Sequence, residues 1–211
     1  MNRSEKSKII LSTLKKLYPD AHCELNYSNP LELLIATILS AQCTDKRVNS
    51  VTESLFKRFK KPEDYLKVLT SVIENEIRTT GFFRNKAKSI QGACRTLVEK
   101  HQGQVPQTME ELVKLPGVGR KTANVVLGNA FNIPGFPCDT HVIRLSNRLG
   151  LTKSENAEQV EKDVTILFPK QEWTHMSHRL IWHGRRCCYA RKPDCEACPL
   201  QEICEFYRNN L

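Results

Sequence analysis

The segment from Leu115 to Asn124 combines two glycines with two cations in the order L-P-G-V-G-R-K-T-A-N. Glycines such as Gly117 and Gly119 let a backbone turn tightly and approach a ligand closely. A helix that begins at Arg120 and Lys121 adds unpaired N–H donors and a positive dipole end. Together these features predict an anion pocket suited to a phosphate. An ordinary connection between two helices remains the alternative, but it leaves the second glycine and the two cations unexplained.

A second cluster of chemically capable residues lies near the C-terminus. Four cysteines with the spacing C-x(6)-C-x(2)-C-x(5)-C fall within 17 residues: Cys188, Cys195, Cys198 and Cys204. Four soft ligands this close can surround one metal centre. Only one pair is as close as in a zinc knuckle, and the usual ferredoxin run is absent, so the spacing leaves zinc, a [4Fe–4S] cluster and four free thiols open. Cys187 lies outside the spacing and reads as a packing residue or a bystander.

Basic residues surround the first of these cysteines, namely Arg185, Arg186, Arg191 and Lys192. A solvated basic loop is the plain interpretation. A loop that faces phosphates accords better with the whole chain, which has 32 Lys+Arg against 23 Asp+Glu and a net charge of +9. Cations that displace counterions from phosphates gain affinity, so the charge favours nucleic acid as a partner.

The third chemically suggestive segment runs from Cys138 to Arg144 and reads C-D-T-H-V-I-R. Asp139 stands where a helix is expected to begin, and helix capping is the commonest role for an aspartate there. Its carboxylate could also assist catalysis. The two roles can coexist on different carboxylate oxygens.

Helical signals dominate the rest of the chain, and no strand is predicted. Asn29 and Pro30 open one helix, with Glu32 in the position of a capping box. Ser71 with Glu74 is read as another capping box, and Thr108 with Glu111 is expected to start a short helix. Apolar residues then recur at helical spacing over about ten segments. The sequence therefore predicts an all-α fold.

Two lobes are expected, because residues 131–137 hold two prolines and a glycine and form the best linker candidate. The 211 residues suffice for one domain or two small ones. No apolar run is long enough to cross a bilayer, and the polar start lacks a signal-peptide core. We expect a soluble intracellular protein.

Taken in order, these segments resemble the endonuclease III family, the iron–sulfur members of the helix–hairpin–helix DNA glycosylases. The resemblance is carried by residues 115–124, by D-T-H-V at 139–142 and by the four-cysteine spacing. It is also carried by L-S-A-Q at 39–42, followed by Thr44 and Asp45. It extends from about residue 20 to the C-terminus.

The resemblance implies a two-lobed architecture. Residues 23–133 would form a six-helix barrel lobe with a helix–hairpin–helix at about 108–130. Residues 1–22 and 134–211 would form an iron–sulfur cluster lobe from both termini. The active-site cleft would lie between the lobes.

The implied activity is the removal of oxidised pyrimidines from duplex DNA after the damaged nucleotide is flipped out of the stack. Lys121 matches the nucleophile that forms a Schiff base with the sugar and permits β-elimination. Asp139 matches the assisting carboxylate. Because only a neutral amine attacks, activation must come from desolvation or from proton transfer to Asp139. The four spaced cysteines match the ligands of a [4Fe–4S] cluster, which resolves the choice between zinc and iron–sulfur.

Further residues are implied as DNA contacts. Gln42 matches a residue that fills the gap left by the flipped base, and Phe82 occupies the place where a leucine wedge is usual. The remaining expected contacts are Gly117, Gly119, Arg120, Arg144, Arg191 and Lys192. The expected partner is damaged double-stranded DNA, without a membrane, for a monomer in the bacterial cytoplasm at the nucleoid.

Three other functions share part of this sequence pattern. An adenine-mismatch glycosylase shares the hairpin and the cluster but typically lacks this lysine and has an extra C-terminal domain, whereas Lys121 is present and seven residues follow Cys204. A non-catalytic DNA-binding module would not need Lys121 and Asp139 together. A redox iron–sulfur carrier has no use for the long helical body or the positive charge.

Overall fold

The computed structural model describes residues 1–210, and these residues contain helices and no β-strand, which confirms the all-α prediction. The α-helices are α1 (Arg3–Leu17), α2 (Pro30–Leu39), α3 (Asp45–Arg58), α4 (Pro62–Leu66), α5 (Thr70–Glu76), α6 (Phe83–His101), α7 (Met109–Leu112), α8 (Arg120–Ala130), α9 (Thr140–Arg148), α10 (Ala157–Thr165), α11 (Trp173–Arg186) and α12 (Glu205–Arg208). Short 3₁₀ helices are η1 (Arg78–Thr80), η2 (Lys170–Glu172) and η3 (Gln201–Ile203). None of the described helices is both long and apolar enough to span a membrane.

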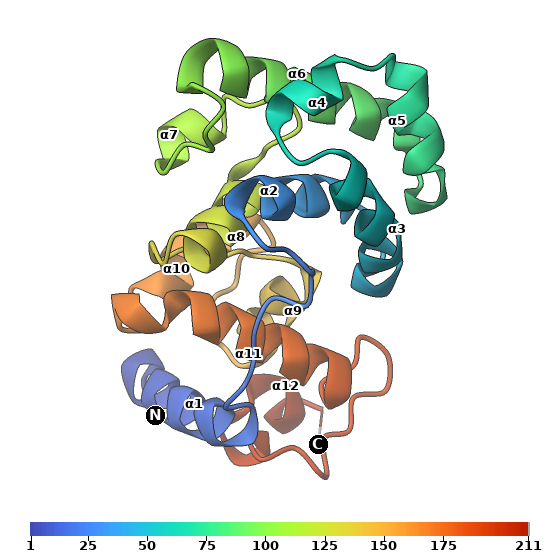
Figure 1. Cartoon of the computed structure of the whole chain (residues 1–211). Helices are drawn as coiled ribbons and strands as arrows, with labels where there is room; N and C mark the ends of the chain where they lie inside the picture. Colours follow the sequence, from blue (N-terminus) through green and yellow to red (C-terminus); the bar gives the residue numbers. More distant parts are fainter. Residues whose placement is uncertain (211) are drawn as a thin grey trace. The chain divides into compact units, whose positions relative to one another are not determined.

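The chain forms two compact units, which we call the central unit and the terminal unit (Figure 1). The central unit comprises Glu24–Ile133, and the terminal unit comprises Met1–Cys23 with Pro134–Leu211. The division after Ile133 falls inside the segment 131–137 that the sequence marks as a linker.

The central unit is built around α2. All but two of its ten residues are buried, because α2 is covered by α3, α6 and α8. A helix that is apolar on every side is stable only when neighbours enclose it. Asn29 caps α2 by accepting from the Glu32 N–H at 3.0 Å, as expected, whereas the Glu32 carboxylate accepts from the Ser28 N–H instead of completing the box.

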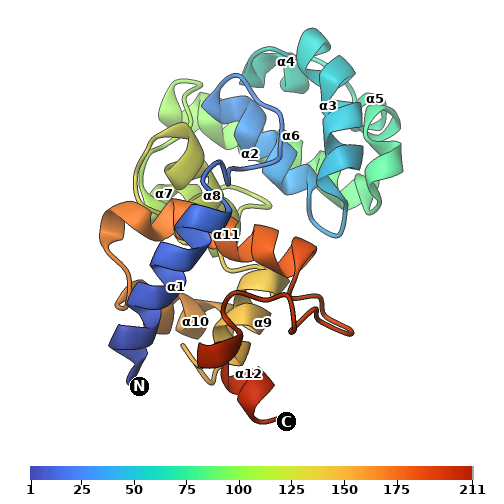
Figure 2. The same ribbon diagram turned by 90° about the horizontal axis from the view of Figure 1, so that it is seen from below.

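The terminal unit packs α1 and α9 against α11, and Figure 2 shows α1 beside α11. Its core is a cluster of buried apolar side chains from both ends of the chain, including Ile10, Leu14, Leu145 and Leu180. An ion-pair chain fastens α1 to α11, since Glu172 accepts from both Lys15 and Arg179 at 2.7 Å. The N-terminal and C-terminal segments are therefore one folding unit although 110 residues separate them.

One local prediction is wrong, and one helix was not predicted. Ser71 does not cap a helix: α5 begins at Thr70 after Leu69, because the Val72 N–H is accepted by the Leu69 carbonyl. The N-terminal helix α1 was not predicted, although Asn2 and Glu5 form a complete capping box there. The remaining expected helix starts at Thr108, Gly119 and Asp139 lie where the sequence put them.

Candidate active site and metal centre

The hairpin between α7 and α8 is held by its apolar residues and exposes its polar ones. Leu115 and Val118 are buried, and the Val118 N–H donates to the Leu115 carbonyl at 3.1 Å. Gly117 has φ +77°, and a Cβ at this position would lie 2.5 Å from the Ser89 Cβ on α6. Gly117 is thus required by the protein's own turn and packing.

Gly119 has a different reason to be glycine. It is the N-cap of α8 with φ −94°, and among the described residues a Cβ there would meet no atom within 4 Å. Neither backbone strain nor internal packing excludes a side chain at this position. The open space lies at the start of α8, where helical N–H groups lack intrahelical acceptors, so an external anion could approach closely.

Lys121 is the second residue of α8 and is exposed, as is Arg120. Within residues 1–210, no hydrogen bond or ion pair engages the Lys121 Nζ. An amine with no internal partner is available to a ligand placed at the helix start. The structure therefore assembles Gly119 and Lys121 on one accessible helix terminus.

Gln42 and Phe82, far apart in sequence, line one open hollow in the central unit. Gly117 and Lys86 line the same hollow. Gln42 has φ 53° and Phe82 has φ 48°, and both side chains are exposed. Two non-glycine residues in the left-handed region indicate local strain of a kind found at functional sites.

Asp139 belongs to the terminal unit and is the N-cap of α9. Its Oδ1 accepts from the Val142 N–H at 2.9 Å, so the capping role is confirmed. No described residue hydrogen-bonds to Oδ2. One carboxylate oxygen thus fixes the side chain and leaves the other for a second role.

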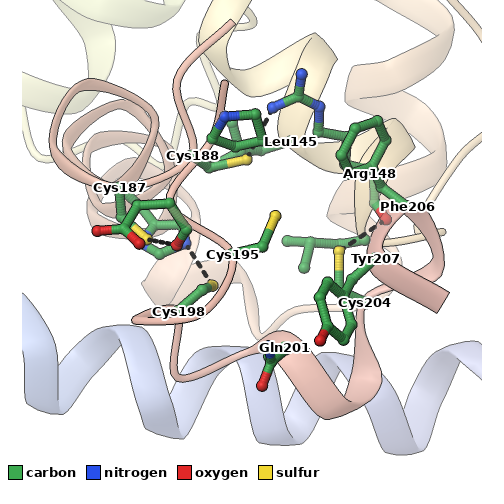
Figure 3. A pocket seen from close by; sticks show the side chains of 14 residues that line it. Leu145, Arg148, Cys187, Cys188, Cys195, Cys198, Gln201, Cys204, Phe206 and Tyr207 are labelled. Carbon is green, nitrogen blue, oxygen red and sulfur yellow. Dashed lines mark hydrogen bonds between the residues drawn. The ribbon is translucent and has the colours of Figure 1, made fainter. Parts of the chain in front are cut away.

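The four spaced cysteines line a single hollow in the terminal unit, shown in Figure 3. Its walls come from α9, the end of α11, the loop after it and α12. The sulfurs lie on the lining together with Leu145 and Phe206. A loop with few apolar residues of its own thereby brings four sulfurs to the lining of one hollow.

This donor set fits an iron–sulfur cluster better than a single zinc ion. A tetrahedral Zn²⁺ with Zn–S bonds of about 2.3 Å needs its sulfurs roughly 3.8 Å apart. Among residues 1–210, the only group of three or more such ligand atoms within 4.8 Å of one another is His183, Cys187 and Cys198. Only one of the four spaced cysteines belongs to it. The four thiols therefore surround a wider space with the soft donors that an iron–sulfur cluster uses.

Cys198 contacts a buried histidine that is itself hydrogen-bonded. Its Sγ lies 3.5 Å from His183 Nε2, and His183 Nδ1 lies 3.1 Å from the Tyr18 hydroxyl. Burial lowers the pKa of His183 to about 4 and raises the pKa of Tyr18 to about 12, so both are neutral at pH 7. We assign the tautomer in which Tyr18 donates to Nδ1 and Nε2–H faces the Cys198 sulfur, so that this hydrogen bond orients the Cys198 side chain.

Cys187 is not remote from this group. It lines the same hollow, and its Sγ donates to the Asp194 carbonyl at 3.4 Å. Of the two alternatives left open by the sequence, a packing residue or a bystander, this contact agrees with the packing residue, since Cys187 also lies beside Cys198. The spacing of the cysteines does not indicate this contact, because the contact depends on how the loop folds back.

Two arginines on one face of α9 hold the loop that carries Cys188. Arg148 donates to the Cys188 Sγ at 3.2 Å and to the Tyr189 and Ala190 carbonyls at 2.7 and 3.0 Å. Its guanidinium also lies 4.4 Å above the Phe206 ring. Arg144 donates to the Cys188 carbonyl at 2.9 Å. Arg148 was not among the predicted site residues. Arg144 was predicted to contact DNA, whereas in the structure its guanidinium donates to the Gly184 and Cys188 carbonyls.

The other expected cations of the loop face solvent. Arg191 and Lys192 are exposed between Cys188 and Cys195, and Lys192 has φ 49°. Arg186 is also exposed but stacks on Trp182, with its guanidinium carbon 3.9 Å from the ring centroid. The loop thus presents cations on a backbone that Arg148 holds from the other side.

Comparisons with known proteins agree with both sites. Residues 35–170 match the family of HhH-GPD superfamily base excision DNA repair proteins, and residues 188–204 match the iron–sulfur binding domain of endonuclease III. The endonuclease III of Synechocystis sp. is 53% identical over 204 residues, which are 96% of this chain and 93% of the relative.

Solved structures give the same class. A non-covalent endonuclease III–DNA complex superposes with a TM-score of 0.95 at 46% identity, covering 100% of this chain and 99% of the other. A trapped endonuclease III–DNA covalent intermediate gives the same TM-score, identity and coverage. The fold and the two sites thus define a helix–hairpin–helix DNA repair protein with an iron–sulfur cofactor. Within that class, the chain belongs to the endonuclease III family.

Proposed function

We propose that this chain excises oxidised pyrimidines from duplex DNA and then cleaves the strand on the 3′ side of the abasic site. The class of activity follows from the family, which is that of bifunctional DNA glycosylases and AP lyases of base excision repair. One observation carries the residue assignment: the exposed Lys121 follows a glycine that neither strain nor internal packing requires. That arrangement suits a helix terminus that receives a DNA phosphate or sugar.

In the proposed reaction, the neutral Nζ of Lys121 attacks the sugar C1′, and the damaged base leaves with the electrons of the glycosidic bond. Ring opening gives a Schiff base between Nζ and C1′. Loss of a C2′ proton then expels the 3′ phosphate by β-elimination. Water finally hydrolyses the Schiff base and returns the amine.

Asp139 would assist the same reaction. Its unpaired oxygen would stabilise the positive charge that develops on the sugar and accept the amine proton. The hydrogen bond from Val142 to the other oxygen would hold the carboxylate in one orientation. A carboxylate that is already fixed by a helix start needs no further ordering when DNA binds.

The terminal unit would carry the iron–sulfur cofactor on Cys188, Cys195, Cys198 and Cys204. Bound there, a [4Fe–4S] cluster supplies four metal–thiolate bonds that order the loop. The exposed Arg191 and Lys192 would then face DNA phosphates from a fixed loop. Gly117, Gly119 and Arg120 would receive the backbone at the hairpin, while Gln42 and Phe82 would enter the space left by the flipped nucleotide.

We further propose that the two compact units correspond to a six-helix lobe and an iron–sulfur lobe, and that the chain acts as a monomer on DNA in the bacterial cytoplasm. DNA as the partner is supported by the solved complexes of its relatives.

Borohydride trapping on a duplex that contains thymine glycol tests the proposal. The wild type should become covalently joined to the DNA, and Lys121→Gln should bind without becoming joined. Lys114→Gln is a matched control, because Lys114 is an exposed lysine of the same hairpin region and should trap normally. Trapping of Lys121→Gln as efficient as that of the wild type would refute the assignment, and base release without any trapping would support a monofunctional glycosylase.

A further inference from the structure

One lysine lies buried outside the proposed chemistry. Lys86, in the first turns of α6, is 5% exposed, and its ammonium is enclosed in the central unit. Nζ donates to the Leu39 carbonyl and to the Thr80 carbonyl, both at 2.8 Å. A buried ammonium is costly unless its hydrogen bonds are satisfied, and an apolar side chain of similar length would fill the space without that cost. The charged group is therefore expected to have a specific task.

Both acceptors end a helix. Leu39 is the last residue of α2, and Thr80 is the last residue of η1. Carbonyls at helix C-termini lack intrahelical donors and carry the negative end of the dipole, so a cation is favoured there. One ammonium thus joins two helix ends that are 41 residues apart in the chain.

Each of these ends leads directly into a strained turn. Gln42, three residues after Leu39, has φ 53°, and Phe82, two residues after Thr80, has φ 48° with 64% of its surface exposed. Such conformations persist only where the surroundings hold them. Phe82 is exposed and caps α6 without a side-chain hydrogen bond, so little holds its turn from the outside.

We infer that Lys86 is a positioning residue that joins the turn at 40–42 and the turn at 80–82 into one rigid element. This inference rests on the proposed function, in which Gln42 and Phe82 enter the DNA around the flipped nucleotide. Two side chains that replace one nucleotide must arrive at a fixed separation. A preformed pair loses less entropy on binding than two independently mobile turns, so more binding free energy is available to open the base pair.

The test separates opening of the duplex from the chemistry at Lys121. Lys86→Met keeps an unbranched side chain that is one atom shorter and removes its donors. Lys100→Met is the control, because Lys100 is an exposed lysine on the same helix. Each protein is given two substrates under single-turnover conditions. One is a thymine glycol in a fully paired duplex, and the other is a single strand with a preformed abasic site, where no base pair has to be opened.

We expect Lys86→Met to excise thymine glycol from the duplex at least tenfold more slowly than the wild type and to cleave the single strand within twofold of it. Amide hydrogen exchange in residues 40–43 and 80–84 should accelerate in this variant without DNA. Lys100→Met should match the wild type in all three measurements. Lys86→Gln, whose amide can still donate to one carbonyl, should fall between the wild type and Lys86→Met on the duplex.

Equal losses on both substrates would overturn the inference, since they would indicate a general structural role. An unchanged rate on the duplex would overturn it as well. Unfolding of both Lys86 variants would show that the lysine holds the whole unit rather than the two turns. A wild type that cleaves neither substrate would instead refute the proposed function.

Discussion

The two hairpin glycines should respond in opposite ways to the same substitution. In Gly117→Ala the new Cβ would lie 2.5 Å from the Ser89 Cβ, and its φ of +77° is unfavourable for alanine. In Gly119→Ala the Cβ would meet nothing within 4 Å among the described residues, and its φ of −94° suits alanine. The first change should damage the fold, and the second should leave the fold intact while it obstructs a ligand.

The magnitudes follow from these contacts. For Gly117→Ala, a left-handed backbone costs about 1–2 kcal/mol and overpacking about 1–3 kcal/mol, so roughly 2–5 kcal/mol of stability should be lost. For Gly119→Ala, the gain of about 0.4–1 kcal/mol from a less flexible unfolded chain offsets a slightly poorer helix cap. Its stability should therefore stay close to that of the wild type.

Urea unfolding followed by circular dichroism measures the first effect. With a slope near 3 kcal/mol per molar urea, the midpoint of Gly117→Ala should fall by about 0.7–1.7 M, while that of Gly119→Ala should barely move. Fluorescence anisotropy with duplex DNA measures the second effect, and Gly119→Ala should bind at least about fivefold more weakly. Equal midpoints for the two variants would refute the packing argument. Unchanged DNA binding by a folded Gly119→Ala would refute the argument that DNA approaches the protein backbone closely at Gly119.

Two further predictions concern residues with combined roles. Asp139→Asn should keep the cap of α9, since asparagine caps as well as aspartate, yet slow base release much more than it weakens DNA binding. Asp139→Ala should additionally lose about 1 kcal/mol of stability; a folded Asp139→Asn with the wild-type rate would leave capping as the only role. Cys198→Ser should lose iron and the visible absorption of the cluster, whereas Cys187→Ser should keep both, because a serine hydroxyl can still donate to the Asp194 carbonyl. Stoichiometric zinc in the wild type, or loss of iron from Cys187→Ser, would contradict the ligand set.

Local sequence signals were sufficient for several helix starts that depend only on neighbouring residues. The starts of α7, α8 and α9 were predicted because capping residues and the glycine turn act within a few positions. The same reasoning could have found α1, where Ile10 and Leu14 are buried one turn apart behind a capping box at Asn2. The prediction that Ser71 caps a helix is wrong, because a backbone turn from Leu69 starts α5 without any side-chain cap.

Contacts between distant segments could not be predicted in this way. Lys86 reaches a carbonyl 47 residues earlier, and Arg148 reaches a sulfur 40 residues later. Nothing in the spacing around either residue distinguishes it from an exposed cation on an amphipathic helix. The same holds for His183, whose partners Tyr18 and Cys198 lie on two other segments. Positions that hold a site together are therefore harder to find from sequence than those that carry out its chemistry.

The lysines and arginines that give the chain its net charge of +9 serve two purposes. Some bond to groups of the protein itself, and others are exposed to solvent. Arg144 and Arg148 satisfy carbonyls of the cysteine loop, Lys86 satisfies two helix ends, and Arg179 pairs with Glu172. These cations stabilise the backbone from within and are poorly placed to displace counterions from DNA, which requires exposed groups. Exposed cations at the hairpin and the loop, including Arg120, Lys121, Arg191 and Lys192, would face phosphates in the proposed complex. Composition alone therefore overstates the charge available to DNA, because several cations are engaged with carbonyls and a carboxylate of the protein itself.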